Sequence, residues 1–233
     1  MRGRKIAVVL VLAGLAGLGI AYALFFTPET PEELAISETP GTEAEGDESS
    51  ITEPTGAWEV VSGSEAGYRV REKLARLPAP SEAVGRTQAV TGGLTVEPRG
   101  EDYAVKDVEV QVDVSKLESD SPRRDNALRT RGLETDRYPL ARFVGQQALV
   151  IPQTAGRGET VKATLEGLLT IHNVTKQVSI PVEARLNGDR AEVAGSFTFP
   201  MSEFDIEPPN IAGIVTVEPT GTMEFRLVLA KAA

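Results

Sequence analysis

The sequence predicts an all-β domain of about eight antiparallel strands, preceded by one membrane-spanning helix. Apolar and polar residues alternate with a period of two in residues 161–171 and 177–186, as in two half-buried strands. Similar short segments recur along the chain between turn signals, and one short segment carries helix start and stop signals. About eight such strands form a sandwich or close into a barrel, and closure removes exposed edges.

The N-terminal residues predict export. Residues 6–26 form a run of 21 residues without a charge, preceded by three basic residues. At about 1.5 Å per residue this run spans the ~30 Å hydrocarbon core of a bilayer, and the basic flank is expected to stay in the cytoplasm. We interpret residues 1–26 as a basic flank and single-pass anchor in the cell membrane, with the C-terminal domain outside the cytoplasm. The alternative is a signal peptide with the pattern Ala21-Tyr22-Ala23, whose cleavage after Ala23 would release a secreted domain.

Residues 27–56 predict a disordered tether. The segment holds nine acidic residues, four prolines and no basic residue, so it cannot bury enough apolar surface to fold on its own. The folded domain is expected to occupy residues 57–233. The tether carries nine negative charges and the leader three positive ones, which leaves −4 of the chain's net −10 on the domain. This mild charge, without a basic and aromatic stripe, argues against a nucleic-acid partner.

Cysteine is absent from the chain, and histidine occurs once, as His172. These counts exclude disulfide bonds, thiolate metal sites, histidine metal clusters and a serine–histidine catalytic triad. Acidic pairs such as Glu134 with Asp136 carry no sign of the burial that would mark an acid/base pair. The sequence therefore predicts no catalytic residue, no metal and no cofactor, and it does not indicate an oligomeric state.

The predicted strands follow one another in short steps. Residues 57–61 and 68–71 are typical of short strands, whereas residues 73–84, with two prolines, predict a loop or a broken helix. The remaining predicted strands are residues 87–96, 103–114, 141–151, 160–171, 177–186, 191–199 and 214–229. The link 173–177 is too short for a crossover, so the strands beside it are expected to pair as a hairpin. Pro181 cannot donate to a ladder, so its strand is expected to have an edge, bulge or gap there.

One short helix is predicted between the strands. Ser121 can cap it, Pro122 occupies the favoured first helical position, and Gly132 can end it. Asp125 and Arg129 have the i,i+4 spacing of a helix-surface ion pair.

Four motifs resemble those of the YceI-like family, in the same order and spacing. They are R-R-D-x-x-L-R at residues 123–129, Y-P-x-A-x-F at 138–143, L-T-I-H-N-V-T-K at 169–176 and F-D-I at 204–206. The resemblance covers residues 57–229, and residues 63–70 are similar to membrane-anchored actinobacterial variants of the family. Asn173 and Asp205 stand where relatives usually or often have glycine, and both residue types tolerate the left-handed backbone that such turns need.

The resemblance implies an extended, lipocalin-like antiparallel β-barrel that holds an isoprenoid lipid, a polyprenyl chain or an isoprenoid quinone, in an apolar interior. The side chains expected to line that interior are Tyr68, Val108, Val110, Val112, Phe143, Leu165, Val178, Ile180, Val182, Phe197, Phe225 and Leu227. Arg123, Arg124 and Arg129 could clamp a pyrophosphate head group, because guanidinium groups match phosphate oxygens. Pairing of these arginines with Asp120 and Asp125 is the structural alternative, which we favour. For His172 we likewise favour a hydrogen bond that stabilises its turn over contact with a ligand.

The function predicted from the resemblance is extracytoplasmic binding of an isoprenoid lipid, with transport or storage as its use and without catalysis. One alternative is a structural or interaction module of the cell envelope, which predicts an exposed apolar patch. Another is an enzyme acting on a hydrophobic substrate, which requires titratable residues that point into the barrel. The alternation places none there convincingly.

Overall fold

The computed structural model describes residues 30–37, 53–74, 80–211 and 215–232. The predicted membrane anchor at residues 6–26 and more than half of the predicted tether lie outside these ranges. Within them, no helix has the length and apolar character needed to cross a membrane.

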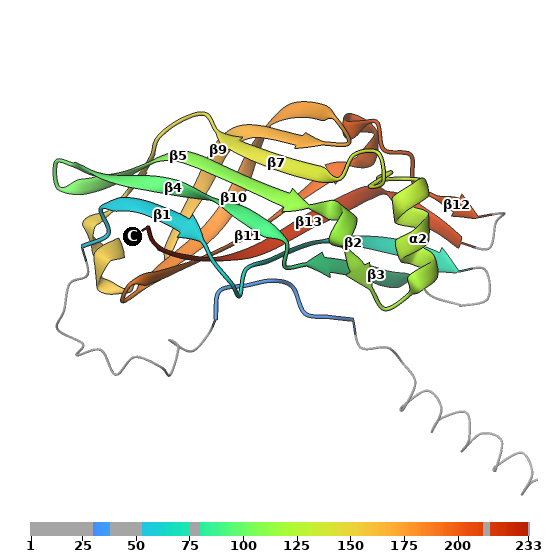
Figure 1. The fold of residues 1–233 in the computed structure, drawn as a ribbon, viewed down its shortest axis with the longest axis horizontal. Helices are drawn as coiled ribbons and strands as arrows, with labels where there is room; N and C mark the ends of the chain where they lie inside the picture. The colour runs from blue at the N-terminus through green and yellow to red at the C-terminus, as the bar shows by residue number, and fades with distance from the viewer. Residues whose placement is uncertain (1–29, 38–52, 75–79, 212–214, 233) are drawn as a thin grey trace, which may run out of the picture. The chain divides into compact units, whose positions relative to one another are not determined.

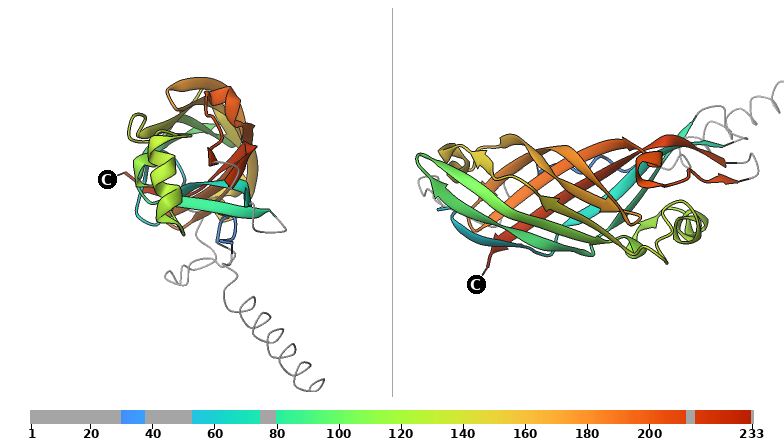
Figure 2. Two further views of the ribbon diagram at one scale, coloured as in Figure 1. Left: turned by 90° about the vertical axis from the view of Figure 1, so that its right-hand side faces the viewer. Right: turned by 90° about the horizontal axis from the view of Figure 1, so that it is seen from above.

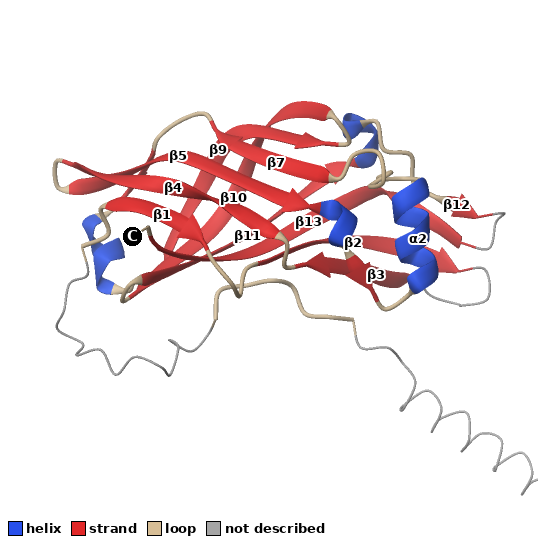
Figure 3. Cartoon of the chain, in the orientation of Figure 1, coloured by secondary structure: helices blue, strands red, loops and turns tan. Residues whose placement is uncertain are grey.

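Eight antiparallel strands close into a barrel (Figures 1 and 3). In order around the ring they are β1 (Gly56–Val60), β4 (Val90–Arg99), β5 (Asp102–Asp113), β7 (Leu140–Gly145), β9 (Val161–Ile171), β10 (Val174–Asn187), β11 (Arg190–Pro200) and β13 (Val215–Lys231). The ring closes because β1 pairs with β4 on one side and with the end of β13 on the other. The predicted all-β barrel with one short helix is thus confirmed.

A second group of strands extends one end of the barrel. β2 (Glu65–Leu74) pairs with the first part of β13, β3 (Ser81–Thr87) pairs with β2, and the short β6 (Glu118–Ser119) pairs with β3. α2 (Pro122–Thr130) follows β6 and lies at the rim of this end, as Figure 2 shows. Two further short strands, β8 (Leu149–Ile151) and β12 (Asn210–Ile211), pair with β5 and β13.

The structure corrects two of the predicted elements. The loop or broken helix predicted over residues 73–84 is wrong in part, because β2 continues to Leu74 and β3 begins at Ser81. The single strand predicted over residues 141–151 is two strands, β7 and β8, which pair with different parts of β5. Between those parts Asp107 has a φ of 51°, a local irregularity in β5 that separates the two pairings.

The hairpin of β9 and β10 is tighter than predicted. Ile171 pairs directly with Val174, so the loop is the two residues His172 and Asn173, with φ values of 52° and 61°. Positive φ at both central residues is the geometry whose twist matches a hairpin. The left-handed backbone expected at Asn173 is confirmed, as is that at Asp205, where φ is 53°.

The expected interruption at Pro181 is also confirmed. β10 pairs with β9 from Val174 to Ala184, but its pairing with β11 begins only at Val182, opposite Gly195. Pro181 therefore lies just beyond the end of the ladder toward β11, where no amide donor is needed. Along this part of β10, Val178, Ile180 and Val182 are buried and Ser179 and Pro181 are exposed, as the alternation predicts.

Part of the predicted tether contacts the outside of the barrel. The amide and hydroxyl of Ser37 donate to the carboxylate of Glu192 at 2.9 and 2.8 Å, and Arg185 donates to the Ser37 carbonyl. At the other end of this segment Arg86, on β3, donates to the carbonyl of Glu32. Residues 32–37 thus form a strap anchored to β10 and β11 at one end and to β3 at the other, across β13 and β2.

Replacing Glu192 with alanine is expected to release the strap without unfolding the barrel. Hydrogen bonds to charged groups contribute about 1.5 to 3 kcal/mol, so the amide of Ser37 should exchange with deuterium at least about tenfold faster. Hydrogen exchange followed by mass spectrometry measures this rate. Glu183→Ala is the control, because Glu183 pairs with Lys162 and not with the strap. Equal exchange in both variants would contradict the assigned anchor.

Candidate functional site: an apolar cavity in the barrel

A cavity of about 850 Å³ runs inside the barrel. Residues of all eight ring strands and of β2 border it, and most of them are Val, Leu, Ile, Ala, Phe or Gly. The lining extends from Pro54 and Glu159 at one end to Arg124 and Leu128 of α2 at the other. Pockets that bind small molecules have volumes of about 300 to 1,000 Å³ and mostly apolar walls, so this interior can hold a ligand.

Most of the predicted lining residues border this cavity. They are Tyr68, Val108, Val110, Val112, Phe143, Leu165, Ile180, Val182, Phe225 and Leu227. Val178 and Phe197 do not border it. Val178 is buried in the hydrophobic core, on the part of β10 beyond its pairing with β11. Phe197 stacks on Phe199, with ring centroids 5.6 Å apart, and only Phe199 faces the cavity.

Aromatic rings in the wall lie over glycines of the neighbouring strand. A Cβ built on the glycine would lie 2.4, 2.4 and 2.8 Å from a ring atom in the pairs Tyr68–Gly85, Phe143–Gly167 and Phe225–Gly195. Each ring therefore fills the place of the missing side chain instead of crossing the interior. Glycine alone permits this arrangement, which leaves open space in a small barrel. Each of these glycines has the inward parity of its strand, but alternation does not show that a ring from the neighbouring strand lies over it.

α2 brings polar groups to one end of the cavity. The helix begins at Pro122 and Gly132 follows it with a φ of 60°, as predicted, but the Ser121 side chain makes no cap. Asp125 accepts hydrogen bonds from the amide and hydroxyl of Ser119 at 3.0 and 2.6 Å. The carboxylate of Asp125 thus fixes the turn before the helix, in place of the predicted pairing with Arg129.

Arg124 is held by carboxylates. Its Nε and Nη2 donate to the two oxygens of Glu72 at 2.9 and 3.0 Å, and its Nη1 donates to Asp120 and to the Ser119 hydroxyl. These hydrogen bonds, that to Glu72 above all, raise the pKa of Arg124 above its ordinary value. Glu72 is buried and borders the cavity. This inward carboxylate was not among the predicted lining residues, because the predicted strand ends at residue 71.

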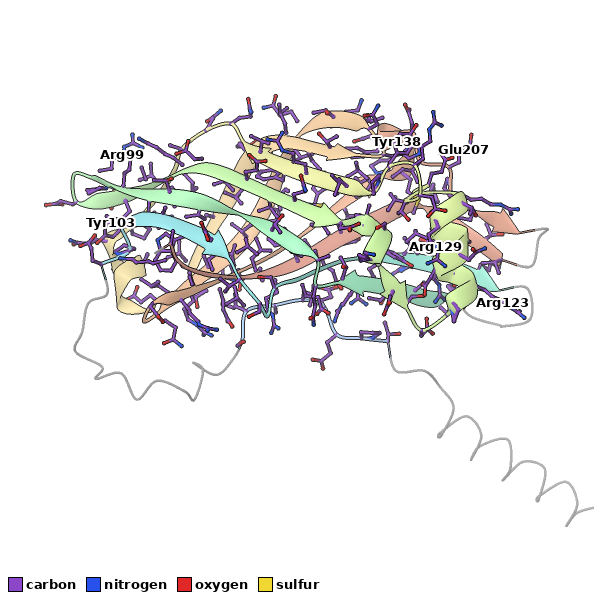
Figure 4. The ribbon with its side chains drawn as sticks, viewed as in Figure 1. Arg99, Tyr103, Arg123, Arg129, Tyr138 and Glu207 are labelled. Atoms are coloured by element: carbon purple, nitrogen blue, oxygen red, sulfur yellow. The ribbon has the colours of Figure 1, made fainter. Side chains whose placement is uncertain are left out.

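The structure separates the three predicted head-group arginines. Arg123 and Arg124 border the cavity and Arg129 does not. Arg123 is exposed, and Figure 4 shows it and Arg129 at different points along α2. Arg124 pairs with Glu72 and Asp120. Pairing with carboxylates, the role favoured from the sequence, therefore describes Arg124 better than binding of a pyrophosphate head group.

His172 holds loops together outside the cavity. One ring nitrogen lies 2.9 Å from Oε2 of Glu134, the other lies 3.2 Å from the carbonyl oxygen of Phe204, and the Tyr138 ring packs edge-on at 4.5 Å. These contacts support the role favoured for His172, a hydrogen bond that stabilises its turn. The partners of His172 come from two other connecting segments. Tyr138, His172 and Phe204 belong to three of the four sequence motifs. These motifs therefore meet around His172, where their contacts stabilise the fold. Among the described residues, no group of acidic and histidine side chains could hold a metal ion.

Comparison with known proteins agrees with this architecture. Three solved structures are similar in fold: a polyisoprenoid-binding domain from Saccharophagus degradans implicated in plant cell wall breakdown, BcnA of Burkholderia cenocepacia, and a mutant YceI protein of Campylobacter jejuni. Their TM-scores are 0.57, 0.50 and 0.51, and their sequence identities 15%, 18% and 15%. The matches cover 76%, 70% and 69% of this chain, and 99%, 95% and 91% of those chains. At these identities the likeness shows the fold alone.

The sequence comparison identifies the family. No curated protein matches the chain. The family model for the YceI-like domain matches residues 58–229, which is most of the chain and agrees with the resemblance carried by the four motifs. The chain therefore belongs to the YceI-like family.

Proposed function

We propose that the barrel binds an isoprenoid lipid in its interior and does not catalyse a reaction. The observation that carries the proposal is the apolar cavity of about 850 Å³ inside the ring of strands. A hydrocarbon tail gains about 0.8 kcal/mol for each CH₂ group removed from water, so such a wall needs no specialised chemistry to retain it. The description of the Saccharophagus relative as a polyisoprenoid-binding domain supports the choice of ligand class. A cavity that shields a tail suits transport or storage.

The two alternatives have less support. A structural module predicts an exposed apolar patch, but the large apolar residues exposed in the described ranges are Leu140 and Val150, at 46% and 42%. An enzyme requires a nucleophile or base free to act in the cavity. In the part of the chain that the structure describes, four carboxylates border the cavity. Arg124 holds both oxygens of Glu72 and also pairs with Asp120, Arg69 and Arg86 hold Glu224, and Glu159 is exposed at the other end.

The proposed site of action is outside the cytoplasm, at the membrane. This part of the proposal rests on the charge-free run at residues 6–26 and its basic flank. An uncleaved anchor would keep the native protein with membranes after a high-salt wash, whereas cleavage after Ala23 would release it with Leu24 as its first residue.

The ligand can be tested by denaturing the purified protein and analysing an organic extract by mass spectrometry. We expect an isoprenoid lipid in the extract. In Ile180→Phe the larger side chain narrows the cavity next to Leu165, with which Ile180 pairs, at a cost in stability of about 1 to 3 kcal/mol. This variant should remain folded and retain less lipid or a shorter one.

Ser179→Phe is the matched control, because the side chain of Ser179 is exposed on the outer face of the same strand. It should carry as much lipid as the wild type. An extract without lipid from the wild type would contradict the proposal. An equal loss of lipid in both variants would show that the cavity does not hold it.

A further inference from the structure

The phenol of Tyr68 is a buried polar group without a hydrogen-bond partner. Three described residues have such an atom, namely Tyr68, Thr135 and Arg226, and of these only Tyr68 borders the cavity. Its ring packs against the backbone of Gly85 on the neighbouring strand. Leaving a buried donor unsatisfied is unfavourable, and a ligand atom that accepts the hydrogen bond would remove that cost.

The Ser119 hydroxyl neighbours this phenol and interacts with it, but not with the geometry of a hydrogen bond, and it is committed to other groups. The Ser119 hydroxyl donates to Asp125 at 2.6 Å and accepts from Arg124 and from the Ser121 amide at 3.2 Å each. Burial raises the pKa of Tyr68 above its ordinary value, so the phenol keeps its proton at neutral pH. It therefore offers a hydrogen bond to whatever occupies this end of the cavity.

The charges at this end are already balanced. Arg124 faces two carboxylates, Glu72 and Asp120, which take up its guanidinium donors. The other cations that border the cavity are Arg123, which is exposed at the rim of this end, and Arg142 and Arg185, which pair with Glu109 and Glu192. A pyrophosphate group requires several uncommitted cationic donors, whereas a neutral group requires none.

We propose that the α2 end of the cavity is a head-group subsite for a neutral isoprenoid, in which the Tyr68 phenol donates a hydrogen bond to a carbonyl oxygen of the ligand. An isoprenoid quinone has this chemistry, and a polyprenyl pyrophosphate does not. The subsite rests on the proposed function, because a head group reaches Tyr68 only when its tail lies in the cavity.

The test compares three ligands of matched isoprenoid tail length on the full chain after removal of bound lipid: a quinone, a pyrophosphate and a plain hydrocarbon. We expect the quinone to bind about tenfold more tightly than the hydrocarbon, as one recovered hydrogen bond of about 1.4 kcal/mol predicts. The pyrophosphate should bind more weakly than the quinone. In Tyr68→Phe the advantage of the quinone over the hydrocarbon should disappear, while hydrocarbon binding stays unchanged.

Tyr103→Phe is the matched control. Tyr103 is also buried but does not border the cavity, and Figure 4 places it at the end of the barrel opposite α2. This variant should keep the preference for the quinone. If the wild type bound none of the three ligands, the proposed function would be overturned and the subsite with it. Hydrocarbon binding with no preference for the quinone, a preference for the pyrophosphate, or a preference that survives in Tyr68→Phe would overturn the subsite alone.

Discussion

Replacing Ile180 with lysine is expected to destabilise the barrel by more than about 4 kcal/mol, which is a large fraction of the stability of a typical domain. Ile180 is 2% exposed and lies in the middle of β10, facing the cavity. The substitution replaces a packed side chain with a longer one and buries an ammonium group that has no carboxylate opposite it. Leu165 is the residue that pairs with it across the ladder. Urea unfolding followed by circular dichroism measures the loss.

Ser179→Lys is the control for this substitution. Its side chain is exposed on the same strand, next to Glu166, which its hydroxyl contacts at 2.7 Å. The change in the free energy of unfolding should be within about 0.5 kcal/mol. If both lysines destabilised the protein equally, the assignment of inward and outward faces along β10 would be wrong.

Replacing Glu224 with alanine is expected to destabilise the protein by about 3 kcal/mol, at the lower end of the range for breaking a buried ion pair. Glu224 is 2% exposed, although its parity in β13 places it on the outer side of the sheet. Its carboxylate accepts from Arg69 at 3.3 Å and from Arg86 at 2.9 Å. Without it both guanidinium groups lose a buried charged partner. Arg69 keeps Glu82, whereas Arg86 keeps the Glu32 carbonyl and has Glu65 as its next carboxylate, 3.8 Å away.

The exposed pair of Glu109 with Arg142 gives the comparison. Its atoms are 2.7 Å apart, but both side chains are about half exposed, at 50% and 48%. Solvent screens such pairs, so Glu109→Ala should change the free energy of unfolding little. Chemical denaturation of the two variants measures the difference between them. Similar losses would show that burial does not decide the contribution of ion pairs in this sheet.

Strand alternation located most of the barrel, because each ring strand has one face toward the apolar interior. Val178, Ile180 and Val182 show this on β10, where the buried positions are those predicted. The sequence pattern does not predict β3, because its only apolar residues besides glycine are the adjacent Ala83 and Val84, which do not alternate. The predicted strand at residues 68–71 is also shorter than β2, its partner. The split of residues 141–151 into two strands depends on an irregularity at Asp107 in another strand, which alternation in the segment itself does not reveal.

The site was predicted less completely than the fold. Parity identified residues such as Val110 and Leu165, which border the cavity. It could not show that Arg124 is held by Glu72, since the two are far apart in sequence and meet only through the position of α2. Nor could it show that Tyr68 lies over Gly85 with its phenol unpaired, because this depends on pairing between β2 and β3.

The central claim is that the interior of the barrel holds the lipid, and a crystal structure of the protein loaded with an isoprenoid quinone tests it most directly. The predicted result is continuous density inside the barrel that passes Ile180 and ends with a carbonyl oxygen about 2.7 Å from the Tyr68 phenol oxygen. Lipid bound on the outer surface, with an interior that contains no lipid density, would contradict the claim.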